Sequence, residues 1–485
     1  MLQQTQAPHP GLRQGALSIG FIIFFVVSAA SPLSVLAGGF PIGIMLGNGP
    51  GTPALLLVTL GILLTFSAGY TAMARHVTNA GGFYAFSCRG LGGLLGGGAG
   101  MLAMFCYNIL QIGVYGLFGA VVSDTVSTAF HLVLPWWAYS FMALASVAIL
   151  GYRQIDLSAR LLSVMVTAEY LTILVLDACI LLKGGEAGVN LDAFKPAAVS
   201  SGSPSIGLLF CFAAFIGFEA TTIYGEEARD PKRAIPIATF AAVLLIGAFY
   251  SLSLWAMVVG VGANKIVPAL QAMQDPTTFI YGLSDRYAGH GLTQVIRVLF
   301  IVSIYAGLLA FHNSAARYFF ASGRDRLLPQ VLGRAHGRHQ SPHVGSLLQS
   351  FIAAVVVGIF ALLHADPVLQ LFAWLSNVAT LCVILLMAIT SAAVIGFFRK
   401  RSAMQSVRGE SWVRTQALPA ISCVLLTYVL ITAIRHFDVL TGASGWLADA
   451  LCSLVPLAVL LGVALAARLR RVSAEHYRRL GTYTP

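Results

Sequence analysis

Charged residues are scarce in this sequence. Asp, Glu, Lys and Arg make up 10% of its 485 residues, whereas about 25% is usual for a soluble domain. Hydrophobic residues make up 58%. Such a composition cannot cover a water-facing surface, which excludes a soluble globular protein. No polar segment is long enough to fold alone, so we expect one membrane-embedded unit.

Features that would indicate an enzyme or a disulfide framework are also missing from the sequence. The seven Cys residues have no CxxC spacing and lie mostly in apolar runs, so we expect free thiols. The sequence has no P-loop, which argues against ATP as an energy source. No His, Cys and carboxylate residues have the spacing of a metal site, and no Ser-His-Asp grouping can be assembled. We therefore expect no enzyme activity, no cofactor and no metal.

The basic residues are more numerous than the acidic ones, which gives a formal net charge of +11. They lie in short stretches between apolar runs and form no stripe, so we expect no nucleic-acid partner. The first apolar run begins near Ala16 and continues to about Met45, which is too long for a cleaved signal peptide. The bilayer is therefore the expected environment of the whole chain.

Apolar runs divide the sequence regularly. A membrane crossing needs ~20 apolar residues, and twelve runs meet or approach that length: about 16–46, 53–74, 92–126, 134–150, 157–182, 205–226, 235–261, 291–320, 345–363, 367–398, 416–434 and 446–467. Gly- and Pro-rich stretches between them are typical of loops. The sequence predicts an all-α membrane protein with twelve transmembrane helices.

The positions of the basic residues predict the orientation of these helices. With a cytoplasmic N-terminus, all but six of the 29 Lys and Arg residues lie on the inner side, the exceptions being Lys183, Lys195, Lys265, Arg286, Arg297 and Arg435. Basic residues favour the cytoplasmic side, and an odd number of spans would mix the two sets. We expect a multi-pass protein of the inner (plasma) membrane with cytoplasmic tails at 1–15 and 469–485.

The first and sixth runs are each interrupted, at Ser-Ala-Ala-Ser-Pro (28–32) and at Gly-Phe-Glu (217–219). Interrupted helices five spans apart predict an inverted repeat of five plus five helices with a substrate site between the breaks. The alternative is that Pro32 only kinks a packed helix. The repeat places the transport core at 16–398, with helices one to five at about 16–182, helices six to ten at about 205–398, and two appended helices at 413–468.

Glu169, Asp177 and Glu219 are acidic residues inside apolar runs. Glu169 is near the centre of the fifth run, where an ionisable group costs ~3 kcal/mol or more and must be paired, protonated or functional. We predict that Glu169 carries a proton; a neutral Glu that bonds two helices is the alternative. Glu219 lies at the break in the sixth run, where it can hold the unwound backbone or take part in proton or cation handling. Asp177 is expected in a vestibule or at the membrane interface.

The third run has a polar face made by Tyr107, Gln111 and Tyr115, which recur every four residues. We expect this face to border the cavity. Secondary candidates in the eighth and tenth runs are His312, Asn313, Ser376 and Asn377. Glycines at GxxxG spacing, Gly92, Gly96 and Gly100, predict close helix packing in the first part of the third run.

Long motifs resemble the amino acid-polyamine-organocation (APC) permeases. Residues 214–220, Ala-Phe-Ile-Gly-Phe-Glu-Ala, and the segment 225–236 are similar to that family's sixth helix and its junction to the seventh. Residues 308–329 are similar to its eighth helix and the following loop, and Gly-Gly-Phe-Tyr at 81–84 resembles a third signature. The resemblance covers about residues 15–400 and implies the leucine-transporter-like fold.

In that family, the unwound parts of helices one and six hold the amino and carboxylate groups of the substrate. The contacts that the resemblance implies are Ser28, Ala29, Ser31 and Pro32 on helix one, Phe215, Gly217, Phe218 and Glu219 on helix six, and Tyr107 and Gln111 on helix three. Some proton-coupled relatives carry a Lys on helix five where sodium would otherwise bind, and Glu169 takes that position here. Because an acid takes the place of Lys, the coupling mechanism stays open. Because the first break lacks a Gly-rich sequence, the mode of carboxylate binding stays open as well.

Together these features predict a secondary active transporter that moves amino acids or related small amines by alternating access, with proton-coupled uptake. Sodium is the alternative coupling ion. An amino acid or amine exchanger is the alternative within the same class, and a transporter-like nutrient sensor is the alternative from another class. The substrate's side chain and the oligomeric state cannot be read from one sequence.

Overall fold

The computed structural model describes residues 17–79, 81–153, 157–225, 227–273, 275–337, 339–402, 410–441 and 445–482. The tail predicted at 1–15 and the last three residues of the tail predicted at 469–485 lie outside the described residues. The described part is helical, and its sole β-pairing is an isolated bridge between Leu17 and Ala228. In a bilayer a helix satisfies its own backbone hydrogen bonds, which is why apolar runs of this length become helices.

The first half of the chain contains α1 (Ile19–Ala29), η1 (Ser34–Gly39), α2 (Phe40–Leu46), α3 (Thr52–Ala74), α4 (Phe83–Leu91), α5 (Gly93–Phe130), α6 (Trp136–Arg153), α7 (Leu157–Leu182), α8 (Pro196–Val199), α9 (Pro204–Ala213), η4 (Phe218–Thr222) and α10 (Pro231–Val261). The second half contains α11 (Ile266–Gln271), α12 (Phe279–Tyr287), α13 (His290–Arg324), α14 (His343–Leu362), η7 (Pro367–Phe372), α15 (Ala373–Ser402), α16 (Leu418–Arg435), α17 (Phe437–Thr441), α18 (Trp446–Val472) and α19 (Ala474–Arg478). Short 3-10 or π-helical turns fill several of the junctions.

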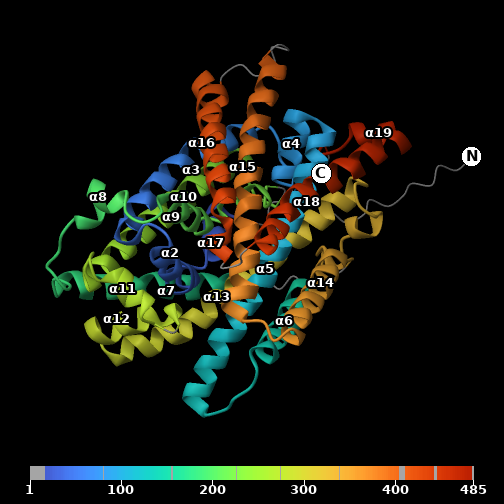
Figure 1. Cartoon of the computed structure of the whole chain (residues 1–485). Helices are drawn as coiled ribbons and strands as arrows, with labels where there is room; N and C mark the ends of the chain where they lie inside the picture. Colours follow the sequence, from blue (N-terminus) through green and yellow to red (C-terminus); the bar gives the residue numbers. More distant parts are fainter. Residues whose placement is uncertain are drawn as a thin grey trace, which may run out of the picture.

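Ten helices in the described part are long and apolar enough to cross a membrane, which confirms a multi-pass helical membrane protein. They correspond to the second, third and fifth to twelfth predicted runs. The first run forms the shorter elements α1, η1 and α2, and the fourth forms α6, whose apolar part Trp136–Tyr152 is also shorter. In Figure 1, α5, α13 and α15 run through the bundle, and α16 and α18 lie beside them.

The break in the first run follows from its sequence. Helix α1 ends at Ala29, Ser31 adopts a left-handed backbone with φ 43°, and the chain continues as the π-helical η1. The residue before a proline is disfavoured in a right-handed helix, so Pro32 and Ser31 together stop α1. The hydroxyl of Tyr250 on α10 donates to the carbonyl oxygen of Ala30 at 2.9 Å, which pairs one backbone group at the break.

The sixth run breaks in a comparable way. Helix α9 ends at Ala213, Gly217 has φ 114°, and the chain resumes as the 3-10 helix η4. A residue with a Cβ would be strained at this φ, which explains the glycine. The two broken segments lie side by side at one end, where the amide of Ser203 donates to the carbonyl of Gly47 at 2.9 Å.

A second pair of segments also matches in geometry. The short α4 is followed by Gly92, with φ 99° and ψ 168°, and then by the long α5. The short α12 is followed by Gly289, with φ 92° and ψ 164°, and then by the long α13. The two glycines directly precede the helices of the third and the eighth predicted runs.

The appended helix α18 packs on α5 through small residues. A Cβ added at Gly462 would lie 2.3 Å from the carbonyl oxygen of Gly97, so neither position has room for a side chain. On another face of α5, a Cβ at Gly100 would lie 2.7 Å from the ring of Tyr84 on α4. The close packing predicted for Gly96 and Gly100 is confirmed, whereas a Cβ added at Gly92 would meet nothing within 4 Å.

Candidate functional site

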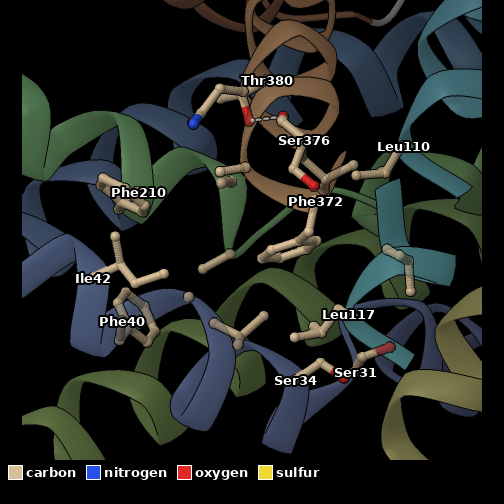
Figure 2. Close-up of a pocket in the computed structure, with 18 of the residues that line it drawn as sticks. Ser31, Ser34, Phe40, Ile42, Leu110, Leu117, Phe210, Phe372, Ser376 and Thr380 are labelled. Carbon is tan, nitrogen blue, oxygen red and sulfur yellow. Dashed lines mark hydrogen bonds between the residues drawn. The ribbon is translucent and has the colours of Figure 1, made fainter. Parts of the chain in front are cut away.

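A cavity of about 120 Å³ lies next to both helix breaks. Its wall comes from five parts of the chain: the first broken segment, α5, the second broken segment, α13 and the junction of η7 with α15. The lining residues are Ala30, Ser31, Ser34, Val35, Gly39, Phe40, Ile42, Leu110, Val114, Leu117, Phe210, Ala213, Ala214, Ile216, Phe311, Phe372, Ala373, Ser376, Asn377 and Thr380. In the view of Figure 2, Phe40, Ile42 and Phe210 border it on the left, and Leu110 and Leu117 on the right.

The wall is mostly apolar and carries five neutral polar residues, Ser31, Ser34, Ser376, Asn377 and Thr380. Thr380 donates its hydroxyl to the carbonyl oxygen of Ser376 at 2.8 Å (Figure 2). The buried hydroxyls of Ser34 and Ser376 have no hydrogen-bond partner among the described residues. A buried polar group without a partner is costly, so these two hydroxyls are available to a polar ligand.

Of the residues predicted to bind substrate, the structure places Ser31 on the cavity wall, together with Ser376 and Asn377 from the tenth run. The side chains of Ser28 and Ala29 lie outside the part that the structure describes. Other candidates lie near the breaks but do not line this cavity: Pro32, Tyr107, Gln111, Phe215, Gly217, Phe218, Glu219, His312 and Asn313.

The polar face of α5 points elsewhere than expected. The side chains of α5 on the cavity wall are Leu110, Val114 and Leu117. Tyr107 and Gln111 instead take part in two buried polar clusters, one with η4 and one with α13 and α14. Polar groups inside an apolar bundle need hydrogen-bond partners, and the neighbouring helices supply them here.

The first cluster surrounds Glu219, whose residue is 1% exposed. One carboxylate oxygen accepts from the Tyr107 hydroxyl at 2.5 Å, and the other accepts from the backbone amide of Gly217 at 3.0 Å. The hydroxyl of Tyr70 on α3 donates to the carbonyl oxygen of Glu219 at 2.8 Å and also contacts the Thr222 hydroxyl. The Glu219 carboxylate thus holds the break at Gly217 against α5.

The second cluster involves the secondary candidate His312. Its Nε2 lies 2.7 Å from the Ser346 hydroxyl on α14, and its Nδ1 lies 3.2 Å from the Gln111 side-chain amide. Gln111 also donates to the carbonyl oxygen of Leu308 at 3.3 Å and accepts from the Gln349 amide. These contacts join α5, α13 and α14 and leave no face of His312 on the cavity.

The bundle is closed on the side away from the cavity, which we call the closed side: the start of α1, the end of η4 and the end of α13. There the Leu17 amide donates to the Glu227 carbonyl at 3.0 Å. The Arg317 side chain donates to the Glu227 carboxylate through Nη2 at 2.9 Å and Nε at 3.1 Å. The two side chains are 8% and 5% exposed, and the guanidinium lies 4.5 Å from the centre of the Tyr224 ring.

Glu169 on α7 is fully buried beside the first break. Its Oε2 accepts from the backbone amide of Leu33, two residues after Ser31, at 3.4 Å. Its Oε1 has no hydrogen-bond partner within the described residues. The neighbouring amide, that of Ser34, donates to the Ser303 hydroxyl on α13 at 3.4 Å. Glu169 therefore lies where α1, η1, α7 and α13 meet.

Asp177 is also buried, which the expectation of a vestibule or interfacial position did not anticipate. The residue is 3% exposed, and one carboxylate oxygen accepts from the Ser253 hydroxyl on α10 at 2.7 Å. The physical reason for burial is that α10 packs along α7 and supplies the Ser253 hydroxyl as a donor. This hydrogen bond lowers the free-energy cost of burying the Asp177 carboxyl.

Sequence reasoning missed several cavity residues altogether, notably Ser34, Phe40, Phe210, Phe372 and Thr380. The aromatic ones resemble any other apolar residue of a membrane helix, so periodicity gives no signal for them. Ser34 was within reach, because it directly follows the predicted break. Across the described ranges, no three His, Cys, Asp or Glu side chains converge as a metal site requires.

Long apolar helices, two of them broken around one cavity, define a class of protein: a polytopic membrane transporter. The amino acid permease family profile matches residues 35–474. The chain belongs to this family, which is part of the APC superfamily, and the resemblance seen in the sequence is confirmed.

Three relatives indicate the range of the family. The chain is 22% identical to the low-affinity putrescine importer PlaP of Escherichia coli (strain K12), over 66% of this chain and 69% of the importer. It is 24% identical to the branched-chain amino acid permease BcaP of Bacillus subtilis (strain 168), over 73% and 75% of the two chains. It is 24% identical to the methylthioribose transporter of the same organism, over 62% and 59%. The family and these relatives are transporters and not enzymes.

Proposed function

We propose that this protein is a secondary active transporter that moves an amino acid or a related small amine by alternating access. The observation that carries the proposal is the cavity where the two broken segments meet, with two unpartnered hydroxyls, Ser34 and Ser376, in its wall. Unwound backbone offers amide and carbonyl groups that suit the carboxylate and amino groups of such a substrate. The names of the relatives support the substrate range, since one is an importer of an amine and one a permease of amino acids.

The architecture that this function requires is a five-plus-five inverted repeat with two appended helices. Counting the first broken segment and α6 as spans gives twelve. The paired breaks at Ser31 and Gly217, and the matching backbone at Gly92 and Gly289, support two related halves. We assign the closed side to the cytoplasm because most basic residues fall there, which puts both termini inside the cell and the protein in the plasma membrane.

In this orientation, the cavity lies on the outer side of the breaks and the route to the cytoplasm is shut. The contacts of Glu219 with Tyr107 and of Arg317 with Glu227 keep it shut. Inward opening has to separate these contacts while the breaks at Ser31 and Gly217 act as hinges. We infer that a protein in this arrangement receives substrate from outside the cell.

We assign proton coupling to Glu169. A protein carboxyl that is buried and has an oxygen without a partner can hold a proton there, and its other oxygen is bonded to the Leu33 amide just after the first break. When Glu169 gains a proton, its carboxyl becomes a weaker hydrogen-bond acceptor for the Leu33 amide. Loss of the proton restores the stronger hydrogen bond. Protonation is thereby linked to the backbone that forms the substrate site. Sodium coupling and obligatory exchange are the alternatives that the test must separate, and a nutrient sensor would bind without transport.

The test is uptake into proteoliposomes with an imposed pH gradient, with and without sodium, using labelled leucine and labelled putrescine as substrates. We expect uptake that follows the pH gradient and does not need sodium, and a loss of at least ~10-fold in pH-driven uptake for Glu169→Gln. The control is Asp177→Asn, on the same helix and equally buried, which should keep the pH dependence.

Full pH-driven uptake by Glu169→Gln would contradict the assignment of the proton site. Uptake that ignores both gradients and needs internal substrate would replace symport by exchange. Binding of either substrate without any uptake would favour the sensor.

A further inference from the structure

Among the described residues, the cavity wall carries no charged side chain. Every lining residue is apolar or, in five cases, neutral and polar. An ammonium or carboxylate at the far end of a substrate would therefore enter this space without a counter-charge, and burial of an uncompensated charge is strongly unfavourable. The wall itself thus discriminates among the substrates that the family's range would allow.

The charged groups nearest to the breaks do not supply the missing counter-charge. The Glu219 carboxylate is bonded on both oxygens, to the Tyr107 hydroxyl and to the Gly217 amide, and does not line the cavity. Arg317 is paired with Glu227 on the closed side. Glu169 lies behind the first break, also off the cavity wall.

The polar groups of the wall lie on two sides of the cavity. Ser31 and Ser34 offer neutral hydrogen-bonding groups beside the unwound backbone of the first segment, and Ser376 and Thr380 lie on the other side, in the first turns of α15 (Figure 2). Phe40, Phe210, Phe372 and the α5 residues listed above form the apolar remainder (Figure 2). The cavity volume of about 120 Å³ is that of a small pocket, which favours a small substrate.

We infer that the substrate is a neutral amino acid with a small aliphatic side chain, such as leucine, isoleucine or valine, and not a diamine or a charged amino acid. The inference rests on the proposed function and narrows its substrate. The amino and carboxylate groups face the break and the serine hydroxyls, and the side chain lies among the phenylalanines. Each methylene of the side chain that leaves water there should strengthen binding about 4-fold.

The first measurement is competition for labelled leucine, both as uptake into proteoliposomes and as binding to the purified protein in detergent. Unlabelled leucine, isoleucine and valine should compete at least ~10-fold better than lysine, glutamate or putrescine. Putrescine or lysine competing as well as leucine would overturn the inference. Because binding is measured separately, an aliphatic preference without uptake would refute transport while the substrate class stands. Uptake of putrescine that follows the pH gradient would support transport and refute the substrate class.

A charge placed in the wall provides the second measurement. Asn377→Asp keeps the shape of a lining residue and adds a negative charge, so it should raise the preference for putrescine over leucine by at least ~10-fold. The control, Asn190→Asp, adds the same charge in the exposed loop after α7, where the side chain bonds its own loop, and should leave the preference unchanged. No change of preference in Asn377→Asp would overturn the inference that the uncharged wall excludes diamines. If that variant does not fold, Phe372→Ala replaces it, with an expected loss of at least ~10-fold in leucine binding. Unchanged leucine binding by Phe372→Ala would contradict the placement of the aliphatic side chain beside Phe372.

Discussion

Closure of the inner side is predicted to depend on the pair formed by Arg317 and Glu227. The guanidinium donates twice to one carboxylate oxygen, and the side chains are only 8% and 5% exposed. Glu227→Gln keeps the size of the side chain and removes its charge, so the buried Arg317 loses the carboxylate to which it donates twice. Breaking a buried pair in this way costs about 3–5 kcal/mol.

That cost falls on the closed arrangement alone if opening lets water reach Arg317. Taking the lower value, the balance between closed and open forms should shift about 100-fold toward opening on the inner side. The assay is labelling of a cysteine introduced by Ala220→Cys, since Ala220 in η4 is 1% exposed. A membrane-impermeant maleimide applied from the inner side should react much faster in the Glu227→Gln background than with Glu227 present.

The matched control is Glu410→Gln, because Glu410 pairs with Arg75 at 3.3 Å and the two side chains are 13% and 41% exposed. A partly exposed pair contributes less than a fully buried one, so labelling should change much less. The parent protein without Ala220→Cys gives the background from the native cysteines. Equal labelling in Glu227→Gln and Glu410→Gln, with both proteins monodisperse, would refute the role of the buried pair.

Two further predictions concern stability. Hydrogen bonds from Lys265 and Arg286, together with their charges, lower the pKa of Glu186 from 4.5 to about 2. The stabilisation from these ion pairs is therefore present above pH 4.5 and is lost as the pH falls through about 2. Glu186→Gln should lower the melting temperature by about 2 °C or less at pH 7 and pH 5, and should not lower it near pH 2. An equal decrease at all three pH values would contradict the ion-pair explanation. Gly462→Val should destabilise the protein by about 1–3 kcal/mol or more, because its Cβ would lie 2.3 Å from the Gly97 carbonyl, and an unchanged melting temperature would show that α18 does not need this close approach.

Much of the fold could be predicted from the sequence, because apolar runs of a given length have few alternatives in a bilayer. The runs and the observed helices agree closely, as at 157–182 and 446–467, which became Leu157–Leu182 and Trp446–Val472. The breaks were also readable, since Pro32 and Gly217 disfavour a continuous helix. The short helices α4 and α12 were not predicted, because each has 9 residues, too few to stand out as a membrane crossing.

The candidate site was harder to predict, because hydropathy says which residues enter a bundle but not which neighbour each one faces. Tyr107 and Gln111 were rightly picked as polar residues on one face of α5, yet that face meets η4, α13 and α14. Phe372 lines the cavity and has no feature that separates it from other phenylalanines of the chain. Only packing in three dimensions tells these residues apart.

The central claim, that the cavity exchanges its contents between the two sides of the membrane, is tested most directly by counterflow. Proteoliposomes are loaded with unlabelled leucine and diluted into labelled leucine, with no ion gradient. Alternating access predicts a transient accumulation of label inside above the external concentration, absent from protein-free liposomes and abolished when the internal leucine is omitted. Purified protein that binds leucine but gives no accumulation above protein-free liposomes would contradict the claim.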